Sequence, residues 1–200
     1  MRLVVATNNA GKVREYERLL ADLPGFTFES LASAGIDIEV VEDRDTFYGN
    51  ALKKAQEVAA VANCAALSDD SGLVVDALGG RPGVYSARYS GQGATPESNN
   101  AKLLEELRDV PPGERTARFV CTIVLVDRAG KELAVAEGAC EGTISDAPRG
   151  DHGFGYDPLF VPLGYDQTMA ELSPEEKNRI SHRGKATAIL AERLRELQLS

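Results

Sequence analysis

Two adjacent carboxylates stand near the middle of this sequence, in the segment Ser68-Asp69-Asp70-Ser71-Gly72. The apolar run Cys64–Leu67 precedes the segment and Leu73–Val75 follows it, so we expect a buried strand on each side. Such a segment is either a turn that breaks a hairpin or a functional site. Burying a carboxylate beside core strands costs free energy unless a cation pairs with it. We therefore expect a metal ion and the chemistry here, with the turn as the alternative.

A second polar segment, Thr7-Asn-Asn-Ala-Gly-Lys12, lies between a predicted strand at Leu3–Ala6 and a helical pattern that runs to about Leu23. A strand, a glycine-containing loop and a helix start can hold phosphate, because backbone N–H groups and the helix dipole face the anion. The P-loop spacing is absent, and a polar turn with a surface lysine is the alternative.

Two later segments supply an aromatic ring and cations. Residues 153–157 carry Phe154 between two glycines, and residues 177–183 carry Lys177, His182 and Arg183. Together with the two earlier segments they offer a phosphate cradle, a carboxylate for Mg²⁺, a platform for a base and cationic donors. A nucleoside triphosphate site needs these groups, since Mg²⁺ takes one or two carboxylates plus phosphate oxygens and waters.

Composition limits the class of protein. The 200 residues are 43% hydrophobic, enough for one domain, 1–200, with or without two lobes. The net charge of -9 argues against nucleic acid as a partner. The three cysteines lack metal-ligand spacing, and Cys64 and Cys121 lie in apolar segments, which predicts reduced core thiols at these two positions. No apolar run approaches the ~20 residues of a membrane helix. We expect a cytoplasmic protein with no membrane partner.

The remaining elements alternate helices and strands, which predicts an α/β protein. One helix is expected from about Thr46 to Asn63, with aspartates near its start as caps, and another begins at Thr95-Pro96. Strands at 116–127 and 131–141 form a hairpin, and residues 148–162 form a loop. The last helix follows Ser181–Lys185 with an apolar stripe at Ala186, Ile189, Leu190, Arg193, Leu194 and Leu197.

Five motifs in order closely resemble the inosine triphosphate pyrophosphatase family, from residue 2 to about 195. They are residues 7–12, residues 68–72, Pro82-Gly-Val-Tyr-Ser-Ala-Arg88, Gly153-Phe-Gly-Tyr-Asp-Pro158 and Ser181-His-Arg-Gly184. The resemblance implies a Mg²⁺-dependent hydrolase that cuts inosine, deoxyinosine or xanthosine triphosphate into the monophosphate and pyrophosphate. It also implies a homodimer, and a long mixed β-sheet flanked by helices in two lobes with the active-site cleft between them.

The resemblance further assigns roles to individual residues. Asp70 would be a metal ligand and the base that prepares water, Glu42 would be a second metal ligand, and Ser71 would meet substrate. The phosphates would be held by Thr7, Asn8, Asn9 and Lys12, with backbone from Ala10 and Gly11. The nucleoside pocket would consist of Phe154, Gly155, Tyr156, Asp157, Lys177, His182 and Arg183.

Asp69 and Asp70 would point to opposite faces of a regular strand. We expect Asp70 to face the metal and Asp69 a structural partner, with a shared metal as the alternative. An ordinary aspartate has a pKa of about 3.9, too low for a strong base, so Asp70 would act mainly by binding the metal or orienting water. Two positions depart from the family: Gly49 replaces a usual glutamate and His152 a usual glycine.

Base selectivity has a chemical basis in this set. Donors such as His182 and Arg183 can satisfy the 6-keto oxygen of inosine but would face the amine of adenine. Guanine also has that oxygen, so its rejection must come from another group. Two rival functions remain open: a related pyrophosphatase for modified pyrimidine nucleotides, and a nucleotide-binding module without catalysis.

Overall fold

The computed structural model describes residues 1–8, 10–19 and 25–199. The strands are β1 (Arg2–Val5), β2 (Thr27–Ser30), β3 (Ala65–Val75), β4 (Thr116–Val126), β5 (Glu132–Ile144) and β6 (Phe160–Pro162). The α-helices are α1 (Ala10–Leu19), α2 (Phe47–Ala62), α3 (Pro96–Glu106), α4 (Pro174–Ile180) and α5 (His182–Leu199). Short 3-10 turns lie at Asp76–Leu78, Gly83–Arg88 and Pro112–Glu114.

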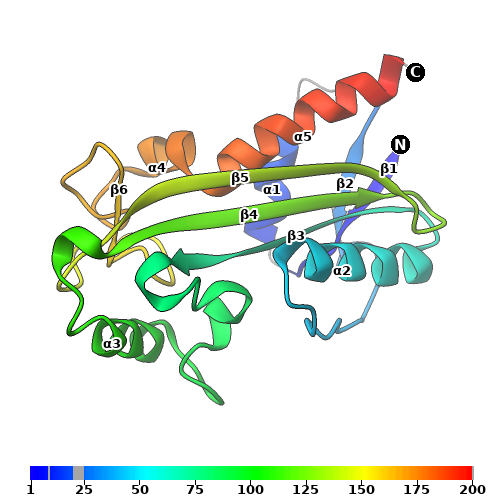
Figure 1. Cartoon of the computed structure of the whole chain (residues 1–200). Coiled ribbons are helices and arrows are strands. Elements are labelled where there is room, and N and C mark those ends of the chain that lie inside the picture. The colour runs from blue at the N-terminus through cyan, green and yellow to red at the C-terminus, as the bar shows by residue number, and fades with distance from the viewer. Residues whose placement is uncertain (9, 20–24, 200) are drawn as a thin grey trace. The chain divides into compact units, whose positions relative to one another are not determined.

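The strands form one six-stranded sheet in the order β2-β1-β3-β4-β5-β6, and β3, β4 and β5 run side by side (Figure 1). β1 pairs in parallel with both β2 and β3, whereas β5 and β6 are antiparallel. The turn between β4 and β5 is closed by the Asp127 N–H donating to the Lys131 carbonyl at 2.8 Å. The expected mixed sheet with helices is therefore confirmed.

The carboxylate segment is part of a strand, and the expectation of a turn between two strands is wrong. β3 runs without a break from Ala65 to Val75 and is buried over most of its length. The physical reason is that β3 is also hydrogen-bonded to the long strand β4 on its other side. Its first neighbour, β1, is short, and the last residue of β1, Val5, pairs with Leu67. Residues 68–70 thus continue past the carboxyl end of β1, the edge where parallel sheets place ligands.

The chain divides into two compact units, which share these three long strands. The first unit comprises Met1–Asp70, Cys121–Gly138 and Lys185–Ser200, and the second comprises Ser71–Val120 and Ala139–Gly184. The boundary falls between Asp70 and Ser71 in β3.

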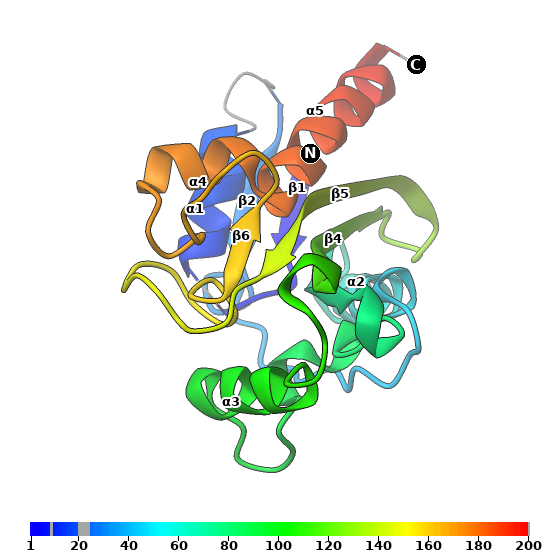
Figure 2. The ribbon, with the colours of Figure 1, turned by 60° about the vertical axis from the view of Figure 1, so that its left-hand side comes forward.

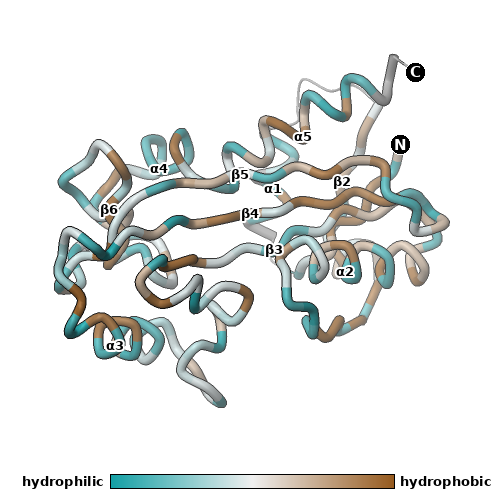
Figure 3. The backbone as a smooth tube through the Cα atoms, viewed as in Figure 1, coloured by the Kyte–Doolittle hydropathy of each residue, from teal (hydrophilic) through white to brown (hydrophobic). Residues whose placement is uncertain are grey.

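In the first unit, different helices cover the two faces of the strands. One core contains Val13 and Tyr16 of α1 together with Leu190 and Leu194 of α5. The other core contains the small side chains of α2, among them Ala51 and Ala55. β4 contributes to both because alternate residues point to opposite faces, and Figure 3 shows its hydrophobic stretch. This part of β4 is therefore covered on both faces.

The second unit has a core rich in aromatic and leucine side chains. Phe119 of β4 and Phe160 of β6 have ring centroids 4.7 Å apart, and Leu103 and Leu107 from the end of α3 are fully buried beside them. Thr95 caps α3 and Pro96 occupies its first helical position, as the sequence predicted. Ser98 completes a capping box with Thr95. α4 leads at Ser181 into the start of α5 (Figure 2).

Several local expectations need correction. α2 is capped by the Thr46 hydroxyl, which accepts from the Gly49 N–H at 3.0 Å, and its first turn holds no acidic residue, so the aspartates are not its caps. β6 lies inside the segment expected to be a loop, because it pairs with the distant residues 142–144. Ile189 is 36% exposed and Arg193 is exposed, so neither belongs to the buried stripe of α5. The predicted end of the first helix lies outside the described residues.

Candidate active site

Asp69 pairs with Lys12, a cation of the polar segment 7–12 that is expected to bind phosphate. Its carboxylate is 4% exposed and lies 3.0 Å from the Lys12 Nζ, which sits on the first turns of α1. Lys12 is itself 28% exposed, so the ammonium is partly accessible. The pair joins the polar segment after β1 to the strand that carries both aspartates. The expected structural partner of Asp69 is therefore a residue that we had assigned to phosphate binding.

Asp70 is held by a helix on the other face of β3. The Asn50 side-chain N–H of α2 donates to the Asp70 Oδ2 at 3.0 Å, and the Asn50 Oδ1 accepts from the Arg44 backbone N–H at 2.9 Å. Asn50 is 1% exposed, so both bonds lie in a low-dielectric setting where they are strong. The amide thereby links the loop before α2 to the carboxylate. The two adjacent aspartates contact different helices, as their alternation on a strand requires.

Glu42, the other expected metal ligand, lies in that loop. Its Oε1 is 2.5 Å from the Lys54 Nζ of α2, and its side chain is 29% exposed. Within residues 1–8, 10–19 and 25–199, no three His, Cys, Asp or Glu side chains gather as a metal cluster. Mg²⁺ needs only one or two protein carboxylates as ligands, because water and phosphate oxygens complete its coordination shell. The donor set on this side of β3 thus fits Mg²⁺.

In the second unit, Asp157 organises the glycine-rich loop. Its Oδ2 accepts from the Phe154 backbone N–H at 2.8 Å and lies 2.5 Å from the Lys177 Nζ of α4. The same ammonium lies 4.7 Å from the centre of the Phe154 ring, whose residue is 64% exposed. A Cβ on Gly153 would come within 2.3 Å of that carboxylate oxygen. Three predicted nucleoside-pocket residues, Phe154, Asp157 and Lys177, are therefore brought together.

The rest of this loop is fixed from behind. The Tyr156 hydroxyl donates to the Ser86 carbonyl at 2.8 Å, and the Asn100 side chain of α3 donates to the Gly155 carbonyl at 3.0 Å. Burial raises the pKa of Tyr156, so its phenol stays neutral and remains a donor. Ser86 belongs to the motif 82–88, whose position in the sequence gave no sign of this contact. Through this hydrogen bond, the motif 82–88 holds Tyr156 of the loop in place.

The corner between α4 and α5 carries His182 and Arg183. The Ser181 hydroxyl accepts from the Gly184 N–H at 3.0 Å and so caps the start of α5. A Cβ on Gly184 would lie 2.4 Å from the Asn178 carbonyl oxygen, so only glycine permits this close approach of the two helices. The His182 imidazole stacks on the Phe119 ring, with centroids 5.0 Å apart and planes 17° apart. Both expected donors thus sit in the first turn of a helix.

The other expected site residues stand as follows. Thr7 is half-buried and its carbonyl accepts from the Leu31 N–H at 3.2 Å, whereas Asn8 is exposed. Ala10 and Gly11 begin α1, and Ser71 lies in β3 just after Asp70. Asn9 lies outside the described residues.

The two departures from the family pattern are also placed. A Cβ at Gly49 would come within 2.9 Å of the Arg44 Cβ, so a larger residue there requires Arg44 to shift. The His152 side chain is 65% exposed. Asn50 and Lys54 were not predicted as site residues, because polar residues inside a helix are common and indicate no particular chemistry. The one usable signal was their spacing of four residues, which puts them near one face of α2.

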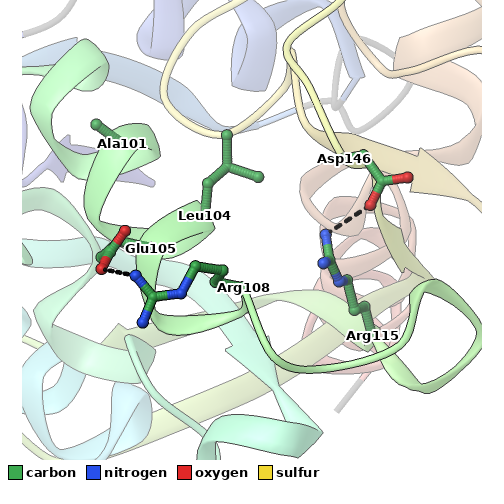
Figure 4. A pocket seen from close by; sticks show the side chains of 6 residues that line it. All are labelled: Ala101, Leu104, Glu105, Arg108, Arg115 and Asp146. Carbon is green, nitrogen blue, oxygen red and sulfur yellow. Dashed lines mark hydrogen bonds and ion pairs between the residues drawn. The ribbon is translucent and has the colours of Figure 1, made fainter.

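A surface pocket of about 350 Å³ in the second unit lies at α3 (Figure 4). It is lined by Ala101, Leu104, Glu105, Arg108, Arg115 and Asp146, none of them an expected site residue. Its charges are paired within it: Arg115 lies 2.9 Å from Asp146, and Arg108 lies 2.7 Å from Glu105. The pocket therefore offers neither the carboxylates nor the base platform described above.

Known proteins resemble this chain over nearly its whole length. The model of the Ham1 family matches residues 3–193. A dITP/XTP pyrophosphatase from Geobacter sulfurreducens is 56% identical over 193 residues, 96% of each chain, and one from Bacillus subtilis is 46% identical over 191 residues, also 96% of each. The chain belongs to the Ham1 family.

Solved structures agree. A HAM1 protein from Coxiella burnetii superposes with a TM-score of 0.92 at 39% identity, covering 98% of this chain and 99% of that one. A nucleoside-triphosphatase / dITP/XTP pyrophosphatase from Mycobacterium abscessus gives 0.82 at 45% identity, covering 95% and 98%. The resemblance inferred from the five motifs is thus confirmed.

Proposed function

We propose that this chain is a nucleoside triphosphate pyrophosphatase that hydrolyses non-standard purine nucleotides, dITP, ITP and XTP, and so removes them from the nucleotide pool. Its relatives in the Ham1 family named dITP/XTP pyrophosphatase support the reaction class. The observation that carries the proposal is the division of labour at β3, where Asp69 pairs with Lys12 and Asp70 with Asn50. The two adjacent buried carboxylates therefore have different partners, which suits them to different roles.

Residues of the first unit would handle the triphosphate. Lys12 would bind phosphate oxygens, helped by Thr7, Asn8, Asn9 and the backbone of Ala10 and Gly11 at the start of α1. Asp70 would orient a water molecule and take its proton as the water oxygen attacks the α-phosphorus. The bond from that phosphorus to the bridging oxygen then breaks, and pyrophosphate leaves. Ser71 would contact the substrate beside Asp70.

Mg²⁺ would be held by Asp70 and Glu42, and when bound it would neutralise charge on the phosphates and polarise the phosphorus under attack. Asn50 would keep the Asp70 carboxylate oriented, through its 3.0 Å hydrogen bond. Lys54 would hold Glu42 within reach, since the two side chains are 2.5 Å apart. Both contacts are formed within the protein and do not require a bound ligand.

Residues of the second unit would bind the nucleoside. The exposed Phe154 ring would stack on the base, a contact worth about 1–3 kcal/mol by analogy with other base–aromatic stacking. Gly155, Tyr156, Asp157 and Lys177 would form the surrounding wall. His182 and Arg183 would donate to the 6-keto oxygen, which inosine and xanthosine have and adenine lacks. We place the enzyme in the cytoplasm. We also propose that its single-domain subunits form a homodimer, which light scattering would test by measuring the molecular mass.

The decisive experiment measures product formation from dITP, XTP, dATP, dGTP and a modified pyrimidine triphosphate, each with Mg²⁺ and with a chelator. We expect the monophosphate and pyrophosphate from dITP and XTP, lost on chelation. Release of orthophosphate instead would contradict cleavage between the α and β phosphates. Preference for the modified pyrimidine would favour that rival function. Tight dITP binding without turnover would favour a nucleotide-binding module.

A further inference from the structure

We infer that Phe119 is a positioning residue that fixes the plane of the His182 imidazole and thereby contributes to base selectivity. The inference rests on the proposed function, in which His182 meets the base. Phe119 lies in β4, far from His182 in the sequence, and belongs to none of the five motifs. Its ring and the imidazole are nearly parallel, 17° between planes, with centroids 5.0 Å apart.

Phe119 is rigid enough to serve as a reference plane. It is 8% exposed, and its ring packs at 52° against Phe160, which is fully buried in β6. An aromatic ring between two strands has little freedom to tilt, because interiors are close-packed. The imidazole stands in the first turn of α5 and stacks on this ring. The stack therefore transmits the fixed orientation of β4 to a side chain at the helix start.

The stack uses only a face of the His182 imidazole. Both ring nitrogens lie in the imidazole plane, so a partner that stacks on a face does not compete for their hydrogen bonds. Fixing the plane fixes the direction in which an N–H can donate. A donor held in one direction discriminates an acceptor oxygen from a donor amine better than one that can swing away. Loss of the stack should thus reduce discrimination more than it reduces binding in general.

The test compares Phe119→Leu and Phe119→Met with Phe160→Leu as the matched control. Phe160 is in the same core and touches Phe119, and its loss opens a comparable cavity. We expect the ratio of kcat/KM for dITP to that for dATP to fall about two- to tenfold in both Phe119 variants, the range set by the worth of one aromatic pair. The ratio should fall less in Phe160→Leu, because Phe160 acts on His182 only through the Phe119 ring.

A second readout needs no substrate. The chain has two histidines, and His152 has a 65% exposed side chain, so its imidazole signal is an internal reference in a proton NMR spectrum. We expect the His182 ring protons of the wild type to be shifted upfield by the Phe119 ring current, and to move toward the His152 values in folded Phe119→Leu.

An unchanged His182 signal in that variant overturns the inference. So does an unchanged selectivity ratio in folded Phe119 variants, or an equal loss in Phe160→Leu, which would indicate a merely structural role. If the wild type hydrolyses no dITP, the proposed function fails, while the NMR comparison still decides whether Phe119 holds the imidazole.

Discussion

Asp70 and Phe154, which we propose act on the phosphates and on the base, are held in two different ways. Asp70 is 8% exposed in the middle of an eleven-residue strand, and a buried asparagine from a helix fixes its carboxylate. Phe154 is 64% exposed in a loop, between Gly153 at φ 87° and Gly155 at φ 60°. The first is held by regular structure, the second by one carboxylate that clamps its backbone.

The difference follows the chemistry proposed for each. A group that orients water must hold its position to a fraction of an ångström, and strands and helices provide that precision better than loops. A ring that stacks on a base needs an open face and tolerates small displacements, since stacking has little directional demand. We therefore expect changes near Asp70 to act on kcat, and changes near Phe154 to act on KM and on the stability of the second unit.

The largest effect should come from Asp70→Asn. The amide keeps the shape but cannot take a proton and is a poorer metal ligand, so kcat should fall about 10²–10⁴-fold without loss of the fold. Pyrophosphate release and thermal unfolding measure the two quantities. Asp69→Asn is the matched control: it weakens the pair with Lys12 and should raise KM more than it lowers kcat. A greater loss of kcat in Asp69→Asn would reverse the roles of the two aspartates.

Asp157→Ala should be the most damaging change in the second unit. It removes the partner of Lys177 and the acceptor of the Phe154 N–H, both in partly buried positions. We expect a loss of about 3 kcal/mol in the free energy of unfolding, measured in urea, and a raised KM. Asp151→Ala, in the same loop but with a 94% exposed side chain, should leave both quantities unchanged. Equal effects of the two substitutions would show that Asp157 does not clamp the loop.

Gly153→Ala against Gly155→Ala separates backbone strain from steric contact. Both glycines have positive φ, but a Cβ on Gly153 meets the Asp157 carboxylate at 2.3 Å, whereas a Cβ on Gly155 meets nothing within 4 Å. We expect a loss of about 2–3 kcal/mol of stability for the first and about 1 kcal/mol for the second. KM for dITP should rise more in Gly153→Ala. The same stability loss in both would mean that the contact with Asp157 is not tight.

The smallest effect should be seen at alkaline pH, and in the second unit. Desolvation and a hydrogen bond to Glu106 raise the pKa of Tyr89 from 10.0 to about 12. Because the folded pKa exceeds the unfolded one, the stabilising contribution is complete below pH 10 and is lost as pH rises through about 12. We expect the free energy of unfolding to fall by about 1–2 kcal/mol across that window. Tyr89→Phe should reduce this dependence and leave the part that comes from the buried Tyr156, whose pKa is also raised. The same change at the exposed Tyr48 of the first unit should reduce it less.

The sequence by itself determined the elements that local chemistry specifies. Thr95-Pro96 fixes the start of α3 through its side-chain oxygen and missing N–H, and alternating apolar residues fix β4. It also determined the family, since five short motifs in order are a specific pattern, and the Ham1 match over residues 3–193 confirms it. The alternation of a strand was enough to assign Asp69 and Asp70 to different faces.

Only the tertiary structure decided how these groups are held. Asp69, Asp70 and Ser71 have turn-forming side chains, so local propensity predicted a break where hydrogen bonding to neighbouring strands makes one continuous β3. Asn100 and Phe119 carry no local sign of their contacts, and Asn50 and Lys54 carry only their spacing of four, because the partners of all four are distant along the chain. Sequence records which groups can do chemistry, whereas orientation depends on long-range contacts that form only when the chain has folded.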